Sequence, residues 1–254
     1  MYEQPLMGPP PEKRSRTWIV WLIVVVAAVA AAAALVAVIV VVVHPGSPHA
    51  AGAAPASSPS TAATGSSGGS TCDWRSGGGT TDRKVSLPAA GVTASTATLH
   101  TNLGDVTISL ERAAAPCTVA SFASLAKQSF YNDSRCHRLT TPAAGLAVLQ
   151  CGDPTGTGSG GPGYTIPDEN LPTGKAMPYP RGTVAMANTG EPHTGGSQFF
   201  INYANNKIPA SYAVFGTITG GMSIVDAVAR AGVNGGGNDG TPRQTIVIQS
   251  VTVS

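Results

Sequence analysis

The chain has 254 residues and a mass of 25.5 kDa, enough for one domain of ordinary size with extensions or for two small domains. Its formal net charge is +2 and only 11% of its residues are charged, so it lacks the basic excess of a nucleic-acid-binding protein. The 31 Gly and 20 Pro residues disfavour an all-helical bundle. Within residues 95–254 the basic and acidic residues balance, which argues against electrostatic capture of a polyanion.

A long apolar segment lies near the N-terminus. From Trp18 to Val43 no residue is charged, and nearly all are Val, Ala, Ile or Leu. A bilayer core needs about 20 such residues, so the segment predicts a transmembrane helix. Because Lys13, Arg14 and Arg16 come just before it, the positive-inside rule places residues 1–17 in the cytoplasm and the rest of the chain outside, at the cell membrane. A cleaved signal peptide, with an apolar region of about 7–15 residues, is the alternative.

Residues 44–94 are predicted to be a disordered linker. Residues 44–71 contain only Ala, Ser, Gly, Pro, Thr and His, whose side chains cannot build a core. The remaining linker residues are also loop-like, although they include Cys72 and Trp74. We therefore expect a compact domain over residues 95–254.

The four cysteines all follow the predicted span, on the side of the membrane where disulfides persist. Two bridges among four cysteines allow three connectivities, which the spacing leaves open. The sequence has no Cys-x-x-Cys pair and no histidines at ligand spacing, so no metal site and no cofactor are expected. The cysteines are Cys72, Cys117, Cys136 and Cys151.

The predicted domain begins with a β-hairpin, because alternating apolar residues flank a Gly104-Asp105 turn. A helix is predicted from Pro116 to about Gln128, since apolar residues recur there at helical spacing and proline suits a first turn. Four short apolar stretches separated by Gly and Pro then predict further strands. They cover 146–150, 183–187, 198–202 and 213–218.

A second helix is predicted over residues 224–231. Ser223 and Asp226 form a capping-box pattern at its start, and Gly232 ends it. A strand over 245–253 completes the domain. Many short strands with two helices predict a mostly β protein in which a closed barrel is plugged by helices.

Three segments carry the strongest functional signal, and a fourth follows them at the expected distance. In this order they span essentially all of residues 95–254 and resemble the cyclophilin family of peptidyl-prolyl cis–trans isomerases. The resemblance implies a closed eight-stranded β-barrel capped by two α-helices, here in a membrane-anchored bacterial form. The segments are Phe130-Tyr131 with His137-Arg138-Leu139; Leu149-Gln150-Cys151-Gly152-Asp153-Pro154 with Gly161-Pro162-Gly163-Tyr164; Arg181-Gly182-Thr183-Val184-Ala185-Met186-Ala187-Asn188 with Gly196-Ser197-Gln198-Phe199-Phe200-Ile201; and Val214-Phe215-Gly216.

Isomerising an X-Pro bond requires no covalent intermediate. Rotation breaks amide resonance against a barrier of about 18–20 kcal/mol, and the prolyl nitrogen then becomes a lone-pair acceptor. A fixed hydrogen-bond donor aimed at that nitrogen stabilises the twisted state selectively. Arg138, which is permanently charged and rigidly forked, is the candidate donor. The resemblance likewise implies that Arg138 is the catalytic arginine.

The resemblance also implies a set of substrate-binding residues. Strand alternation puts Gln198 and Phe200 on one face and Phe199 and Ile201 on the other, so Phe199 is expected in the core and Phe200 as the floor of a proline pocket. Gln150 and Gln198 are expected to orient Arg138 or to bind the substrate backbone. The full set of expected substrate-binding residues is His137, Ala147, Val148, Gln150, Ala187, Asn188, Gln198, Phe200, Ile208 and Tyr212.

The chain departs from the family pattern around this pocket. Ala147 and Val148 stand where the family has a Phe-Met pair, unless Leu146 moves in. The usual tryptophan of the cyclosporin-binding rim falls near residues 207–208, and Tyr212 stands where histidine is common. We therefore expect isomerase activity from a shallower pocket, together with weak cyclosporin binding.

In the family fold Cys136 and Cys151 fall on adjacent strands, roughly opposite one another. The resemblance thus leads to the hypothesis of a Cys136–Cys151 disulfide that tightens the loop carrying Arg138. A Cys72–Cys117 disulfide would then attach the end of the linker to the first helix.

The expected function is isomerisation of X-Pro bonds in exported proteins, which assists their folding, by a monomeric, membrane-anchored enzyme. Its expected partners are proline-containing polypeptides and the membrane, and no nucleic acid. The alternative is a non-catalytic proline-peptide-binding module, or chaperone-like holdase, on the same fold. A hydrolase that uses Ser197 or Cys136 is disfavoured, because the sequence shows no nucleophile–base arrangement.

Overall fold

The computed structural model describes residues 72–79, 81–89 and 93–254. The predicted cytoplasmic tail (1–17), the predicted span (18–43) and the first part of the predicted linker (44–71) lie outside these residues. Among the helices of the described part, none combines the length and the apolarity that crossing a membrane requires.

The domain is built on one ten-stranded sheet in which neighbouring strands run antiparallel. The predicted hairpin is present, with Ala97 opposite Ile108 and Leu99 opposite Val106 on the buried face. The predicted strand regions after the first helix also form strands. In spatial order the sheet contains β11 (Asp239–Gly240), β5 (Arg138–Thr140), β6 (Val148–Cys151), β9 (Phe199–Asn202), β8 (Thr183–Met186), β10 (Val214–Gly220), β3 (Gly104–Leu110), β2 (Thr96–Thr101), β12 (Val247–Val253) and β4 (Ser134–Arg135).

The sheet curls until its two ends meet on one short segment of chain. β4 is the last strand at one end of the sheet and β5 is the second strand from the other end, yet only Cys136 and His137 separate them in the sequence. The Cys136 N–H donates to the Ile246 carbonyl at 3.0 Å, whereas the His137 N–H donates to the Gln150 carbonyl at 3.1 Å. The prediction of a closed eight-stranded barrel is therefore corrected to a curled ten-stranded sheet, interrupted where this segment changes partners.

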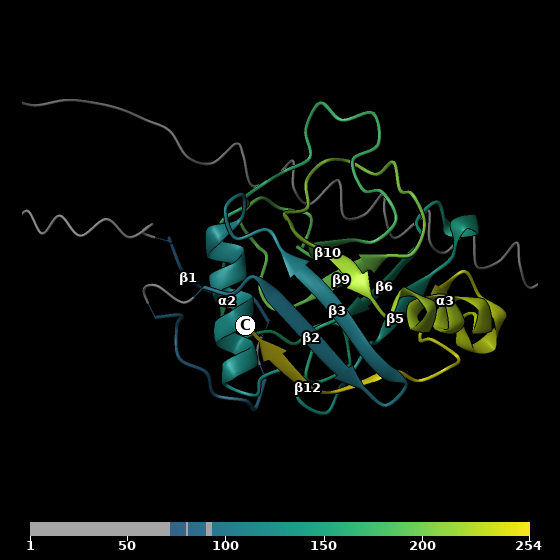
Figure 1. The fold of residues 1–254 in the computed structure, drawn as a ribbon, viewed down its shortest axis with the longest axis horizontal. Coiled ribbons are helices and arrows are strands. Elements are labelled where there is room, and N and C mark those ends of the chain that lie inside the picture. Colours follow the sequence, from purple (N-terminus) through teal and green to yellow (C-terminus); the bar gives the residue numbers. More distant parts are fainter. Residues whose placement is uncertain (1–71, 80, 90–92) are drawn as a thin grey trace, which may run out of the picture. The chain divides into compact units, whose positions relative to one another are not determined.

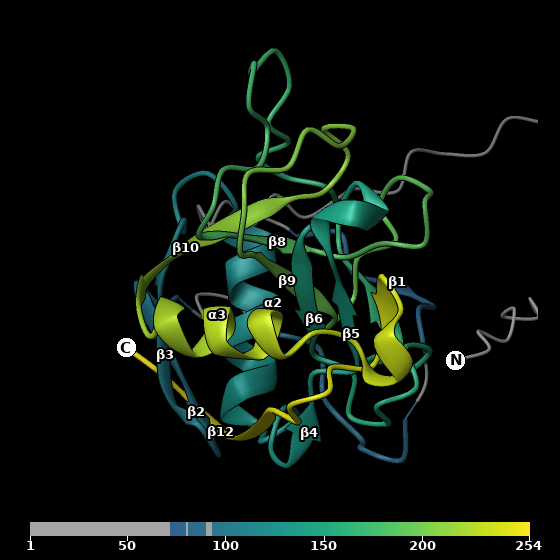
Figure 2. The ribbon, with the colours of Figure 1, turned by 90° about the vertical axis from the view of Figure 1, so that its right-hand side faces the viewer.

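Two α-helices lie at opposite openings of the curled sheet, α2 (Pro116–Lys127) and α3 (Met222–Ala231), as the two views in Figures 1 and 2 show. α2 begins with proline in its first turn, as predicted, and buries most of its residues against the sheet. Two short 3₁₀-helices, η1 (Pro142–Ala144) and η2 (Asn234–Gly236), lie in connecting loops.

The predicted start of the second helix is wrong. Its N-cap is Gly221, at a φ of 77°, and no side chain caps the helix there. A Cβ at Gly221 would lie 2.2 Å from the Asp105 carbonyl oxygen, so only glycine permits this close entry into the helix. Asp226 is therefore not a capping partner, and its carboxylate instead accepts two hydrogen bonds from Arg181 at 2.7 and 2.8 Å.

Strand alternation separates two apolar clusters, as the sequence predicts. Phe199 lies in the main core, where its ring packs edge-on against Phe122 with centroids 5.7 Å apart. Phe200 instead belongs to a small second cluster with Val148 and Tyr179. The alternation thus places one aromatic ring inside the sheet and presents the next one on its outer face.

The compact part of the chain begins before the predicted boundary at residue 95. We call residues 72–79 the N-terminal strap. Within it, β1 (Arg75–Ser76) pairs with β7 (Tyr164–Thr165), and the ring of Trp74 packs edge-on against the ring of Tyr164. The predicted linker thus ends earlier than residue 94, because composition cannot reveal a two-residue strand or the contacts of one tryptophan.

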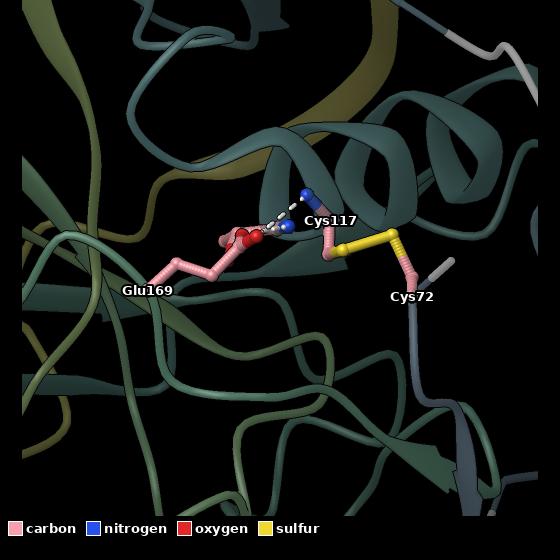
Figure 3. The surroundings of a disulfide bond; sticks show 4 residues. Cys72, Cys117 and Glu169 are labelled. Atoms are coloured by element: carbon pink, nitrogen blue, oxygen red, sulfur yellow. Dashed lines mark hydrogen bonds between the residues drawn. A yellow bond between two sulfur atoms is a disulfide. The ribbon is translucent and has the colours of Figure 1, made fainter. Parts of the chain in front are cut away.

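Both predicted disulfides are present. Cys72 of the strap is bonded to Cys117 at the start of α2, with Cα atoms 5.5 Å apart (Figure 3). Cys136 and Cys151 bridge the junction of β4 and β5 to the end of β6, with Cα atoms 4.0 Å apart. The second bridge lies directly beside the strand that carries Arg138.

Candidate active site

Arg138 lies on β5 and is held by two side chains. Its Nε donates to Asp239 Oδ1 at 2.8 Å and its Nη2 to Asp239 Oδ2 at 2.7 Å, while Nη1 donates to Gln150 Oε1 at 3.1 Å. The hydrogen bonding of Arg138 to the Asp239 carboxylate is the main cause that raises the pKa of Arg138 above its usual value. Three of the five guanidinium N–H groups are thus engaged, which leaves two for another ligand.

A chain of amides supports the Arg138 side chain from behind. Gln150 lies opposite Arg138 in the β5–β6 register, and its Nε2 donates to Gln198 Oε1 at 2.9 Å. The Nε2 of Gln198 donates in turn to the carbonyl oxygens of Gly158 and Gly160, both at 2.9 Å. These bonds fix the orientation of both amides, so the Gln150 oxygen faces the guanidinium.

The glycine-rich loop after β6 is organised by one buried carboxylate. Asp153 accepts backbone N–H bonds from Thr155, Thr157, Gly158 and Gly160 at 2.6 to 3.1 Å. Burial alone would raise the pKa of Asp153, but the hydrogen bonds from Thr155 and the backbone outweigh it and hold the pKa below its usual value. A Cβ at Gly160 would lie 2.0 Å from Asp153 Oδ1, so this position requires glycine. The loop therefore presents the two carbonyls that Gln198 needs.

A cavity of about 130 Å³ opens beside Arg138, and we call it the Phe200 pocket. Phe200 is 5% exposed and its ring meets the ring of Tyr212 edge-on, with centroids 5.3 Å apart. The wall is apolar and the rim carries the guanidinium and two amides. The lining residues are Arg138, Leu146, Val148, Gln150, Ala187, Asn188, Phe200, Ile208 and Tyr212.

Tyr179, which the sequence analysis did not identify, holds one side of this pocket in place. Its ring is fully buried and lies 6.2 Å from that of Phe200 and 6.1 Å from that of Tyr212, between centroids. Its hydroxyl accepts the Tyr212 N–H at 2.9 Å and lies 3.2 Å from the Tyr212 carbonyl oxygen. Burial raises the pKa of Tyr179 to about 12, so it stays a neutral donor.

A second pocket, of about 250 Å³, adjoins the first and shares Gln150, Ala187 and Asn188 with it. The predicted Gln198 belongs to this second pocket. Its lining consists of Gly78, Gly79, Gln150, Gly158, Ser159, Gly160, Gly161, Ala187, Asn188, Thr189, Thr194, Gly196, Ser197 and Gln198.

Two predicted substrate-binding residues lie outside both pockets. Ala147 is buried, and its N–H donates to Asn206 Oδ1 at 2.8 Å. Because neighbours on an extended segment face opposite sides, Leu146 and Val148 line the pocket instead. His137 likewise faces away from Arg138: it is buried beneath the Gly158 turn, and neither ring nitrogen is hydrogen-bonded to another described residue. Burial is the main cause that lowers the pKa of His137.

Neither candidate hydrolase nucleophile is available. Cys136 is consumed in the disulfide to Cys151. The Ser197 hydroxyl is buried and donates to the Gly152 carbonyl oxygen at 2.8 Å. Among the described residues no group of three or more His, Cys, Asp or Glu side chains is placed to hold a metal ion.

Comparisons with known proteins agree with this geometry. The family model "Cyclophilin type peptidyl-prolyl cis-trans isomerase/CLD" matches residues 96–253. The chain is 47% identical over 179 residues to the "Probable peptidyl-prolyl cis-trans isomerase B" of Mycobacterium leprae, an alignment that covers 66% of this chain and 59% of that protein. It is 38% identical over 178 residues to the "Peptidyl-prolyl cis-trans isomerase A" of Mycobacterium tuberculosis, with 63% and 92% covered. The chain thus spans about three fifths of the length of the isomerase B relative.

A solved structure also resembles the domain. The crystal structure of a Cryptosporidium parvum cyclophilin-type isomerase "in the presence of dipeptide ala-pro" has a TM-score of 0.54 and 28% sequence identity, and the match covers 63% of this chain and 98% of that one. The family model matches more than half of the chain, and the solved relative shares its fold. This chain therefore belongs to the family of cyclophilin-type peptidyl-prolyl cis–trans isomerases.

Proposed function

We propose that the chain accelerates the cis–trans isomerisation of X-Pro peptide bonds. The observation that carries this proposal is the position of Arg138 at the rim of an apolar pocket floored by Phe200. Two of its guanidinium N–H groups have no partner among the described residues, and Asp239 and Gln150 fix the group's orientation. The names of the mycobacterial relatives and the dipeptide of the C. parvum structure support the same activity.

The geometry supplies each element that the reaction needs. The apolar wall holds the proline ring, and the amides at the rim bind the flanking backbone. A guanidinium N–H then donates to the prolyl nitrogen once its lone pair is released from conjugation, so the bond strengthens only in the twisted state. Because Arg138 is already oriented, little reorganisation accompanies the rotation. Shortening an exchange of about 10–100 s to about a millisecond needs roughly 7 kcal/mol of such stabilisation.

The proposal extends to the location of the enzyme. Residues 18–43 would anchor the chain in the cell membrane, with the domain on the extracytoplasmic side, where it assists the folding of exported proteins. The uncharged segment, the basic residues before it and the two disulfides of the domain support this placement. Protease added to intact spheroplasts is expected to digest the membrane-bound domain, and protection until lysis would contradict the orientation.

The activity is tested on the full chain in detergent by NMR exchange spectroscopy of a proline peptide. Wild type is expected to accelerate exchange, and Arg138→Ala is expected to lower kcat/KM by about 100-fold or more, as loss of one oriented donor does elsewhere. Arg243→Ala, which removes an exposed arginine away from both pockets, serves as the matched control and should match wild type. If wild type binds the peptide without accelerating exchange, the chain is a binding module and the proposal fails.

A further inference from the structure

The second pocket has a wall that comes from outside the ten-stranded sheet. Gly78 and Gly79 of the strap line it together with Ala187 and Asn188, which also line the Phe200 pocket. A peptide with its proline ring in the Phe200 pocket therefore directs a neighbouring side chain across Ala187 and Asn188 towards the strap. The strap thus lies where it can influence which substrates are accepted.

Backbone bonds and a disulfide hold the strap in this position. The Gly163 N–H donates to the Gly79 carbonyl oxygen at 3.1 Å, and the Gly77 N–H donates to the Gly163 carbonyl oxygen at 3.2 Å. The Cys72–Cys117 bridge attaches the other end of the strap to α2. The attachment point is itself fixed, because Glu169 accepts the Cys117 N–H at 3.1 Å (Figure 3).

The strap also touches the loop that supports the amide chain. A Cβ at Gly79 would lie 2.2 Å from the Ser159 carbonyl oxygen, and one at Gly161 would lie 2.9 Å from the Gly79 carbonyl oxygen. The two backbones are thus in direct contact, without side chains between them. Closing this side of the pocket removes a path by which water would reach a side chain inside it.

The chemistry of the second pocket favours an uncharged occupant. No charged side chain is among its described lining residues. Gln150 and Gln198 are engaged with each other, and Asn188 donates to the Ser211 carbonyl oxygen and accepts the Gly190 N–H. A carboxylate that enters would lose its hydration without gaining a charged partner, which is costly.

We propose that the strap is a specificity-determining wall, and that with it in place the second pocket selects an uncharged side chain flanking the X-Pro pair. The inference rests on the proposed isomerase activity. Its consequence is a preference between substrates that differ only in charge at the flanking position. Neither the Phe200 pocket nor Arg138 alone would produce that preference.

The test compares kcat/KM of the full chain for peptides that are identical except for Gln or Glu at each position from two residues before the X-Pro pair to two after. Two variants displace the strap without changing any charge. Cys72→Ser with Cys117→Ser removes the covalent attachment, and Gly79→Ala forces the strap away from Ser159 while the disulfide stays intact. Asn102→Ala removes two hydrogen bonds far from both pockets and serves as the control for lowered stability.

At one flanking position, wild type and Asn102→Ala are expected to prefer Gln over Glu by about 10-fold or more, because an unpaired charge is excluded. Both strap variants are expected to lower that ratio below about 3-fold while retaining activity towards the Gln peptide. The same ratio in wild type and in both strap variants, or a wild type indifferent to charge at every position, would overturn the inference and leave the isomerase proposal standing. Absence of acceleration with every peptide would instead defeat the proposed function.

Discussion

Arg138 and Asp239 form a two-point ion pair between residues 101 positions apart in the chain, with Nε–Oδ1 and Nη2–Oδ2 distances of 2.8 and 2.7 Å. Asp239 comes from β11, a two-residue strand at the edge of the sheet that pairs with β5. The carboxylate occupies one side of the guanidinium and thereby directs its remaining N–H groups. Asp239 is thus a positioning residue for Arg138.

Replacement of Asp239 by Asn keeps the shape of the side chain but removes the charge and one acceptor. The guanidinium is then held at one point instead of two, so its free N–H groups are less well aligned with the prolyl nitrogen. We expect kcat to fall about 10-fold with little change in KM, a smaller loss than for Arg138→Ala. Asp105→Asn, at an exposed carboxylate elsewhere on the sheet, should leave both constants unchanged. An unaltered kcat in Asp239→Asn would show that Gln150 alone orients the arginine.

The same pair has a defined pH dependence. The hydrogen bond from Arg138 is the main cause that lowers the pKa of Asp239. A carboxyl group with a lowered pKa contributes fully above its usual value of about 3.9 and loses that contribution as the pH falls through the lowered pKa. The kcat ratio of wild type to Asp239→Asn should therefore stay constant from pH 8 to pH 5. A ratio that decreases within this range would contradict the assignment.

Asp153→Asn is expected to destabilise the glycine-rich loop. The amide replaces one carboxylate oxygen with an NH₂ group, yet backbone N–H groups surround both oxygens. Unsatisfied donors in this buried site should lower the free energy of unfolding by about 1–3 kcal/mol. Because Gln198 depends on the carbonyls of this loop, kcat/KM should fall as well. Urea unfolding measures the loss of stability, and the exchange assay measures the fall in kcat/KM. An unchanged urea midpoint would contradict the expected loss of stability.

Because His137 is buried and its pKa is lowered, we expect the protein to lose stability in mildly acidic solution. Burial is the main cause that lowers its pKa in the folded state, whereas in the unfolded chain it is expected near 6.5. The unfolded state therefore takes up the proton first, so stability is full above about pH 6.5 and declines as the pH falls below it. His137→Gln should flatten the difference in urea midpoint between pH 7.5 and pH 5.5. His100→Gln, at a more exposed histidine, should keep the wild-type difference.

Weak cyclosporin binding remains a prediction. In the lining of the Phe200 pocket, position 208 is occupied by Ile208, which has no aromatic ring and no N–H donor in its side chain. Ile208→Trp restores an indole with its N–H donor at this edge, and we expect it to strengthen binding by about 10-fold. Isothermal titration calorimetry of wild type and variant measures the change. Tight binding by wild type would show that the rim tryptophan is dispensable.

The sequence predicted those parts of the site whose residues lie in local motifs. Arg138, Gln150 and Phe200 were identified because the family motifs and the strand alternation are both patterns that extend over only a few residues. Asp239 could not be found in this way, since it lies in a glycine-rich stretch without periodicity and meets Arg138 only through the curl of the sheet. Ala147 was predicted to line the pocket, but its neighbours Leu146 and Val148 do so instead. The sequence pattern does not show which side chains of this extended segment face the pocket.

The strap was missed for a related reason. Its two-residue strand is shorter than any periodic pattern, and its second half, Ser76 to Gly79, is as rich in Ser and Gly as the predicted linker before it. The hypothesised Cys72–Cys117 disulfide pointed to an attachment at one end, but the pairing with β7 and the packing of Trp74 against Tyr164 are visible only in the structure.

The Cys72–Cys117 bridge also determines how mechanical load enters the domain. Any pull on the N-terminal part of the chain reaches Cys72 before the rest of the strap, and the bridge passes it directly to α2. The hydrogen bonds between β1 and β7 lie beyond this junction, so tension bypasses them. Tension applied to the chain before Cys72 therefore does not separate the strap from the second pocket.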